Sequence, residues 1–210
     1  MTSRAALDLM GVTKEKVLGA GLKCLDEVGL DRFSVETVAE RCAITPTSIY
    51  KYFRDADDFH DALTAGALAM LIDVHRDINL DRTGRDALEA YALVERAYGQ
   101  AHPALYSAAL RAARGPSAQL KLLRQTYMSI TITMLRGYDI PRPVAPEIAN
   151  CLSAALQGFV NAEITGRGRG GPEFDRNYER LLDMLDAGAR ASGATPAKQA
   201  QELVVHRRAR

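Results

Sequence analysis

The sequence predicts an all-α protein, and two observations support this prediction. Ala, Leu, Glu and Arg dominate the 210 residues, whereas alternating stretches rich in Val, Ile and Thr are scarce. Apolar residues instead recur at three- and four-residue spacing, and proline or glycine separates the periodic segments. We expect an N-terminal three-helix helix-turn-helix unit and a C-terminal helical bundle, with about nine helices in all.

Three short helices are predicted first. Thr13 is a typical N-cap for the first helix, which Gly29 ends, and Ser34 is a good N-cap for a second helix of about two turns. Thr45 precedes a third helix, because Pro46 suits the first helical position, where its missing N–H costs nothing. The positions expected to face inward are Val17, Gly21, Leu25, Val28, Val35, Val38, Ala39, Cys42, Ile49 and Phe53.

Longer helices are predicted from about residue 55 onward. Either Asp55 or Asp57 caps a fourth helix that runs to about Ile78. Its apolar stripe consists of Phe59, Leu63, Ala67, Met70 and Val74. Proline and glycine divide the rest into helices over about 85–101, 103–113, 117–137, 146–165 and 172–191. The helix over 117–137 has almost no polar face, which is typical of a helix surrounded by others.

The predicted domain boundaries follow the change from short to long helices. We expect a helix-turn-helix DNA-binding domain over residues 1–55 and a ligand-binding and dimerisation domain over 56–195. Residues 196–210 form a basic C-terminal tail, in which Lys and Arg outnumber the one acidic residue, Glu202.

Composition excludes several classes of function. Cys24, Cys42 and Cys151 lack the spacing of a disulfide framework or a zinc site, which favours a reducing, cytoplasmic setting. No apolar run reaches the roughly 18 residues of a transmembrane helix. His75 and His102 have no partner residues at metal-ligand spacing, so we expect neither a metal nor another cofactor. The net charge of +1 means that any nucleic-acid surface must be local.

The second and third helices form the arrangement that places a recognition helix in the major groove of DNA. Because Ile49 and Phe53 point inward, we expect the hydroxyl and aromatic side chains around them to form an exposed arc. Hydroxyl groups bond base edges or phosphates, and Lys51 can reach phosphate oxygens. The predicted DNA-binding residues are Ser34, Thr37, Thr45, Pro46, Thr47, Ser48, Tyr50, Lys51, Tyr52 and Arg54.

The stretch from Thr13 to Leu63 closely resembles the N-terminal domain of TetR-family transcriptional regulators. Gly29 follows the first helix, and the letters S-I-Y-x-Y-F at 48–53 match the family pattern on the third. The resemblance implies a homodimeric regulator, a repressor, that binds a palindromic double-stranded operator and is released by a small-molecule effector.

One position departs from the family pattern. Where the family usually has a lysine opening the fourth helix, this chain has Ala56, with three aspartates nearby. Ala56 cannot make the phosphate contact of that lysine, and Arg54 is the residue that could replace it. We expect lower DNA affinity or an unusual operator preference.

The second half resembles the ligand-binding domain of a TetR subgroup named for a Trp-His-Gly motif. The similar stretches are "AHPALYSAAL", "LQGFVNAEITG" and "FDRNYERLLDML", although Leu156, Gln157 and Gly158 stand at the motif. The resemblance implies that helices 146–165 and 172–191 pair with their copies in a twofold four-helix interface. The alternative is that both helices only close the core of the monomer.

A few polar or adaptable side chains inside an apolar bundle are typical of a ligand pocket. The candidate effector-binding residues are Tyr91, Tyr98, Tyr106, Tyr127, Thr131, Met134, Gln157 and Asn161. Each of them alone is better explained by an ordinary core or interface role than by ligand contact, so the prediction rests on the set.

Catalysis has less support in the sequence. Neither a G-x-S-x-G elbow nor an H-E-x-x-H pair occurs. "GRGRGG" at 166–171 follows a helix and not a strand, so it is interpreted as a loop and not as a dinucleotide site. We therefore expect no enzyme. The alternative function is a helical small-molecule-binding protein or enzyme that does not bind DNA.

Overall fold

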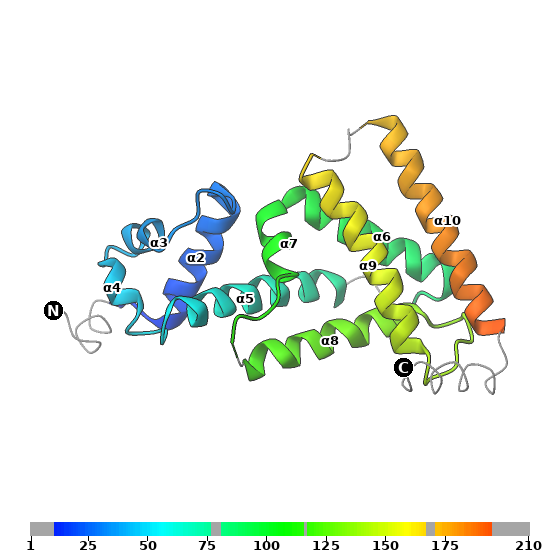
Figure 1. Cartoon of the computed structure of the whole chain (residues 1–210), viewed down its shortest axis with the longest axis horizontal. Helices are drawn as coiled ribbons and strands as arrows, with labels where there is room; N and C mark the ends of the chain where they lie inside the picture. The colour runs from blue at the N-terminus through cyan, green and yellow to red at the C-terminus, as the bar shows by residue number, and fades with distance from the viewer. Residues whose placement is uncertain (1–10, 77–80, 116, 167–170, 195–210) are drawn as a thin grey trace, which may run out of the picture. The chain divides into compact units, whose positions relative to one another are not determined.

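The computed structural model describes residues 11–76, 81–115, 117–166 and 171–194. Within these ranges every regular element is an α-helix, and nine helices, labelled α2 to α10, follow one another without a strand (Figure 1). The all-α prediction is confirmed. None of the helices in the described ranges is long and apolar enough to cross a membrane. The predicted basic tail, 196–210, lies outside the described residues.

The chain divides into two compact units. Unit 1 consists of Met1–Leu71 and His102–Arg124, and unit 2 of Ile72–Ala101 and Gln125–Arg210. Two helices, α5 and α8, contribute residues to both units. Unit 1 is larger than the segment 1–55, because α7 and the first part of α5 belong to it. The functional boundaries at 55 and 195 stay predictions.

Unit 1 begins with three short helices whose starts are fixed locally. The Thr13 hydroxyl accepts from the Lys16 N–H at 3.3 Å, and Ser34 and Thr37 form a reciprocal capping box. Asp55 Oδ1 accepts from the Asp58 N–H at 2.8 Å, so Asp55 and not Asp57 caps the long helix. The helices that contribute to unit 1 are α2 (Lys14–Val28), α3 (Val35–Arg41), α4 (Pro46–Ile49), α5 (Ala56–Arg76), α7 (Pro103–Ala109) and the start of α8 (Ala118–Met134).

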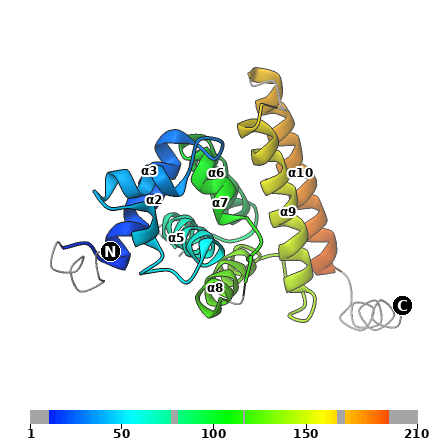
Figure 2. The ribbon, with the colours of Figure 1, turned by 60° about the vertical axis from the view of Figure 1, so that its left-hand side comes forward.

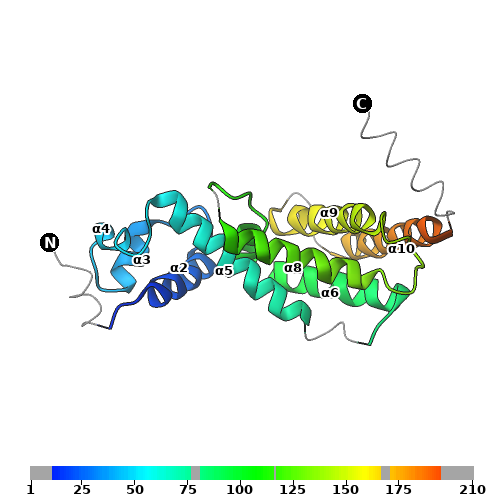
Figure 3. The same ribbon diagram turned by 90° about the horizontal axis from the view of Figure 1, so that it is seen from below.

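Helices α2, α3, α4 and the start of α5 lie together (Figure 3), and an apolar core of buried side chains joins them. The ring centroids of Phe53 and Phe59 lie 4.8 Å apart at its centre. A Cβ at Gly21 would come within 2.8 Å of Leu63 Cδ2, so a larger residue here would require the Leu63 side chain to shift. This core fixes α4 to α2 and α5 without a disulfide among the described residues.

The apolar stripe of α5 differs from the prediction at one position. Met70 is 39% exposed, whereas Leu71 is fully buried. The reason is the regular four-residue step from Leu63 through Ala67 to Leu71, which carries the buried face past Met70. Two helices also end earlier than predicted, α7 at Ala109 and α8 at Met134, whereas the predicted end of the fourth helix, about Ile78, lies outside the described residues.

Unit 2 is a helical bundle. Its helices α6 (Gly84–Ala101), α9 (Ala145–Ile164) and α10 (Pro172–Ala194) are packed against one another, and the ends of α5 and α8 complete it. Helices α9 and α10 run side by side in opposite directions (Figures 1 and 2).

Helix α8 is not surrounded, contrary to the prediction. Leu122 is 63% exposed, and Lys121, Gln125 and Ser129 are exposed on the same side. Lys121, Gln125 and Ser129 are four residues apart, so they form one continuous face in contact with solvent. The sequence pattern does not reveal this face, because apolar residues such as Leu122 and Met128 stand beside it.

A charged cluster connects the three long helices of unit 2. Arg96 on α6 donates from Nη2 to Glu163 on α9 and to Asp175 on α10, both at 2.6 Å. Its Nε donates to the second Glu163 oxygen at 2.9 Å, and its guanidinium lies 4.8 Å from the centre of the Tyr178 ring. A bidentate pair of this kind is both stronger and more directional than a single contact.

Replacing Arg96 with methionine should destabilise the protein at neutral pH. The hydrogen bond from Arg96 lowers the pKa of Glu163 from its ordinary value of 4.5. A lowered folded-state pKa contributes stability above about pH 4.5, and this contribution disappears as the pH falls through the folded-state pKa. We expect a loss of about 1–2 kcal/mol at pH 7 in urea unfolding, shrinking below pH 4.5.

The matched control for this prediction is Arg76→Met. Arg76 is also paired with a carboxylate, that of Asp73, but 61% of its side chain is exposed. This change should leave the stability nearly unaltered, because exposed pairs contribute little. Equal losses for both variants, or a loss in Arg96→Met that does not depend on pH, would contradict the role given to Glu163.

Candidate nucleic-acid interface and effector site

A tight turn separates α3 from α4. The Cys42 N–H donates to the Val38 oxygen at 3.1 Å, and the Ile44 N–H reaches back to the Ala39 oxygen at 3.0 Å. Between them Ala43 has a φ of 53°, in the left-handed region that L-residues rarely adopt. The turn therefore redirects the chain within three residues, which is the connection that a helix-turn-helix needs.

Side chains on α4 and directly before and after it form an exposed surface. Thr45, Pro46 and Thr47 are exposed, Tyr50 is 41% exposed, and Lys51 is partly exposed. The Thr45 hydroxyl lies 3.0 Å from the Thr47 hydroxyl. The two threonine hydroxyls are small hydrogen-bond donors and acceptors, which can bond to base edges in the major groove. We call the surface made by these five residues the α4 surface.

Two residues predicted for the exposed arc are buried. Ser48 is 4% exposed, and its hydroxyl lies 2.9 Å from that of Thr45. Tyr52 is 7% exposed, and its hydroxyl donates to the Val12 oxygen at 2.7 Å. The predicted arc assumes that the third helix extends to Phe53. Helix α4 instead ends at Ile49, and the turn that follows places Tyr52 on the core side. The exposure predicted for both residues is wrong, and their role on DNA stays a prediction.

The remaining predicted DNA contacts have mixed surroundings. Ser34 and Thr37 are half-buried and hydrogen-bonded to each other at the start of α3. Arg54, the residue that could replace the family lysine, is exposed. Its Nε pairs with Asp55 Oδ2 at 3.0 Å, so its positive charge is already paired with a carboxylate. Lys51 has no carboxylate partner in the part of the chain that the structure describes.

Unit 2 contains a buried polar cluster, which we call the Glu95 cluster. Glu95 Oε1 lies 3.1 Å from His75 Nε2 and accepts a hydrogen bond from the Tyr127 hydroxyl. The Tyr91 hydroxyl donates to that of Tyr127 at 2.8 Å and lies 3.1 Å from the Thr131 hydroxyl. His75, Tyr91, Glu95 and Thr131 have no exposed surface. Such groups are costly to bury unless they satisfy one another, as they do here.

Two further contacts extend the Glu95 cluster to α9. Gln157 donates from Nε2 to the Tyr127 hydroxyl at 3.2 Å and to the Ser153 hydroxyl at 2.9 Å. Burial, followed by the charge of Glu95, raises the pKa of Tyr91 and of Tyr127. Both phenols therefore stay protonated at neutral pH and act as hydrogen-bond donors.

A cavity of about 530 Å³ adjoins this cluster in unit 2. The volume lies within the range of sites for small organic ligands. Its described lining residues are His75, Arg76, Thr126, Ser129, Ile130, Thr133 and Arg136. His75 belongs to both the lining and the Glu95 cluster, so the cavity and the cluster share a hydrogen-bonding side chain.

The structure brings together four of the eight predicted effector residues. Tyr91, Tyr127, Thr131 and Gln157 belong to the Glu95 cluster, whereas Asn161 is exposed on α9 and Tyr106 belongs to unit 1. Tyr98 and Met134 are buried in unit 2. None of the eight is among the described residues that line the cavity.

The predicted set omits Glu95 and His75, the two groups at the centre of the cluster. A signal for Glu95 was present, because it lies on the buried stripe of α6 at helical spacing from Tyr91 and Tyr98. A carboxylate at such a position is almost never buried unless it is paired.

A helix-turn-helix in one unit and a helical unit with a buried polar cluster and a ligand-sized cavity define a ligand-responsive DNA-binding protein. Residues 17–63 match the sequence model of bacterial regulatory proteins of the tetR family, and residues 88–185 match that of the tetracyclin repressor-like C-terminal domain. The chain is a TetR-family transcriptional regulator. Regulators of this family are DNA-binding proteins and not enzymes, which sets the catalytic alternative aside.

Individual relatives agree with this assignment. An uncharacterised HTH-type transcriptional regulator of Mycobacterium tuberculosis is 24% identical over 156 residues, which cover 74% of this chain and 72% of that protein. A TetR variant of Acinetobacter baumannii AYE, solved in complex with minocycline, has a TM-score of 0.67 at 20% identity and covers 88% of this chain and 99% of that one.

BioQ of Mycobacterium smegmatis has a TM-score of 0.64 at 20% identity, with 87% of this chain and all (100%) of that chain covered. At this level of identity the two structures establish a shared fold.

Proposed function

We propose that this regulator is a repressor that binds a palindromic operator as a homodimer and is released when a small-molecule effector binds unit 2. The observation that supports DNA recognition most strongly is the α4 surface. It exposes hydroxyl groups, Tyr50 and Lys51, and it follows directly after the tight turn at the end of α3. No acidic residue occurs from Cys42 to Lys51, so nothing within this stretch repels phosphate. A cytoplasmic location, where the operator is accessible, follows from this function.

The proposed dimer interface is formed by α9 and α10. Cys151, Ala154, Gly158 and Asn161 form an exposed stripe along α9, with spacings of three and four residues. Met184 on α10 is 66% exposed. Small residues let two helices approach closely, and an exposed methionine supplies apolar contact, so these features favour pairing with a second copy. We also propose that the chain belongs to the Trp-His-Gly subgroup. Gly158 is the one residue of that motif that it contains.

The proposed effector site is the cavity of about 530 Å³ beside His75. An effector there contacts hydroxyl groups of Thr126, Ser129 and Thr133 and the imidazole that is bonded to Glu95. To turn a DNA-competent dimer into a mostly incompetent one, the effector must favour the second state by roughly 5 kcal/mol. A ligand with equal affinity for both states would not release DNA.

Selection from random duplexes tests the proposal. The full-length protein should retain duplexes that share a palindrome, with half-sites centred about one helical turn apart. Selected duplexes are then measured by gel shift against scrambled duplexes of equal length. Retention without any shared sequence, or no retention at low salt, would overturn the assignment of a sequence-specific repressor.

The salt dependence of this binding should be modest, because Lys51 is the one cation of the α4 surface. We expect log K against log[salt] to have a slope of about −1 to −2 for each half-site. Lys51→Ala should reduce the magnitude of the slope by about one per half-site. Arg142→Ala, an exposed arginine of unit 2, is the control and should leave the slope unchanged. An unaltered slope in Lys51→Ala would contradict the phosphate contact.

A further inference from the structure

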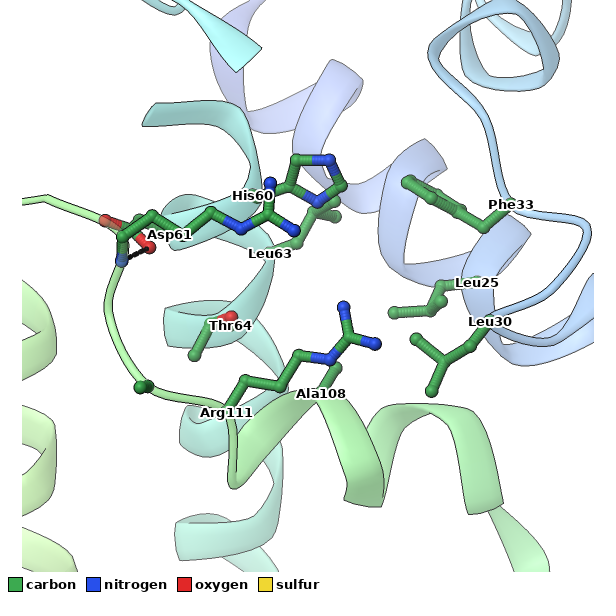
Figure 4. A pocket seen from close by; sticks show the side chains of 11 residues that line it. Leu25, Leu30, Phe33, His60, Asp61, Leu63, Thr64, Ala108 and Arg111 are labelled. Atoms are coloured by element: carbon green, nitrogen blue, oxygen red, sulfur yellow. Dashed lines mark hydrogen bonds between the residues drawn. The ribbon is translucent and has the colours of Figure 1, made fainter. Parts of the chain in front are cut away.

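Unit 1 contains a second pocket, which lies between α2, the loop before α3, α5 and the end of α7 (Figure 4). Its volume is about 90 Å³, much smaller than the cavity of unit 2. Leu25 and Leu63 are almost fully buried beneath it, and Leu30 and Phe33 form one wall. A pocket of this volume is too small for a drug-sized ligand, so we expect at most a single small ring to enter it.

The Arg111 side chain reaches into this pocket. Arg111 is an exposed residue, and its guanidinium extends toward Leu25 and Leu30 (Figure 4). In the described ranges it has no carboxylate partner. A guanidinium carries five N–H donors in a forked arrangement, so an exposed Arg111 can bind an anion that enters the pocket.

The carboxylates near the pocket are already engaged. Asp61 is almost fully buried, and its two oxygens accept the backbone N–H groups of Arg114 and Gly115 at 2.8 Å and 2.9 Å. Asp57 pairs with the Arg114 guanidinium at 3.2 Å. Asp61 keeps its negative charge, because its partners are neutral N–H groups, but neither acid contacts Arg111, which is the cation without a carboxylate partner among the described residues that line the pocket.

His60, which also lines the pocket, is affected by this positive charge. Burial is the largest cause that lowers the pKa of its imidazole, and the charges of Arg114 and Arg111 lower it further. The ring is therefore neutral at pH 7 and adds a hydrogen-bonding group without adding charge. Its ring centroid lies 6.3 Å from that of Phe33, in an edge-to-face arrangement.

We propose that this pocket is a binding site for a small aromatic carboxylate, separate from the effector cavity of unit 2. The carboxylate accepts two hydrogen bonds from the Arg111 guanidinium, whose forked geometry matches it. The ring lies against Leu25, Leu30 and Phe33, which offer apolar surface and one aromatic face. The proposal does not depend on operator binding or on the identity of the effector.

Benzoate tests the proposal, in ligand-observed NMR titrations of the full-length protein. We expect saturable binding with a Kd near or below about 1 mM, as befits so small a ligand. Arg111→Met keeps the apolar stem and removes the charge, and it should weaken benzoate at least about tenfold. Arg142→Met, in unit 2, should bind benzoate like the wild type. Benzyl alcohol, a neutral molecule of similar shape, should bind the wild type about tenfold more weakly than benzoate.

A fluorescence measurement shows where the probe binds. The chain contains no tryptophan, so Phe33→Trp introduces a single reporter into the pocket wall. Benzoate should change its emission and saturate at the same concentration as in the NMR titration. Equal benzoate affinity in the wild type and Arg111→Met, equal affinity for benzyl alcohol, or an unchanged emission at saturation would each overturn the proposal. Loss of operator binding alone would leave it intact and would count against the repressor function instead.

Discussion

Replacing Glu95 with leucine should lower the free energy of unfolding by about 3–5 kcal/mol, the largest stability effect expected in unit 2. The side chain has no exposed surface, and its Oε1 is shared by His75 and the Tyr127 hydroxyl. Leucine fills a similar volume but accepts no hydrogen bond, so both partners lose an acceptor in a place that water does not reach. Urea unfolding at one fixed protein concentration measures the loss.

Two variants make this experiment specific. Glu95→Gln retains an acceptor oxygen and should lose less than half as much stability as Glu95→Leu. Glu89→Leu changes an exposed glutamate of the same helix, which is paired with Arg85, and should have a much smaller effect. If Glu95→Leu proved as stable as the wild type, the Glu95 cluster would not hold α6, α8 and the end of α5 together.

Replacing Thr47 with glutamate should weaken operator binding at least about 100-fold. Thr47 is exposed on the α4 surface, where the proposed function places the DNA backbone and base edges. A carboxylate there meets phosphate charge in both half-sites of the dimer, and about 1.5 kcal/mol of repulsion in each gives this factor. Gel-shift titration of the selected palindrome measures the change.

The control for the DNA prediction is Arg142→Glu. It changes the charge of the protein more than Thr47→Glu does, but at an exposed position of unit 2. Its operator affinity should stay within about threefold of the wild type, because screening removes most of the long-range effect at physiological salt. Comparable losses in both variants would mean that net charge, and not the α4 surface, determines DNA affinity.

The helices and their starts could be predicted because they depend on neighbouring residues. Thr13, Ser34 and Asp55 cap helices through bonds that span three residues. The burial of Tyr52 could not be predicted in this way. Its hydroxyl bonds to Val12, forty positions earlier in the chain, and a helix of only four residues gives no period from which to derive the inward face.

The polar cluster beside the proposed effector cavity was predictable only in part, for a similar reason, and none of the predicted residues is among the described residues that line the cavity itself. Tyrosine, threonine and glutamine on long helices indicated polar groups in a bundle, and four of these residues do belong to one cluster. Glu95, which accepts the hydrogen bond of Tyr127, was missed because a charged residue is assigned to the surface by default. His75, from a third helix, is brought to Glu95 only by tertiary packing.

The position of His75 also bears on which molecules can act as inducers. In the proposed mechanism a purely apolar molecule could occupy the cavity and leave the bond between His75 and Glu95 untouched. Such a molecule would have equal affinity for the DNA-competent and the DNA-incompetent state. It would occupy the cavity without releasing DNA, and it would compete with the true effector. We expect an inducer to offer a polar group that bonds to the His75 imidazole in place of Glu95. Selectivity would then be decided by a swap of hydrogen-bond partners and not by shape alone.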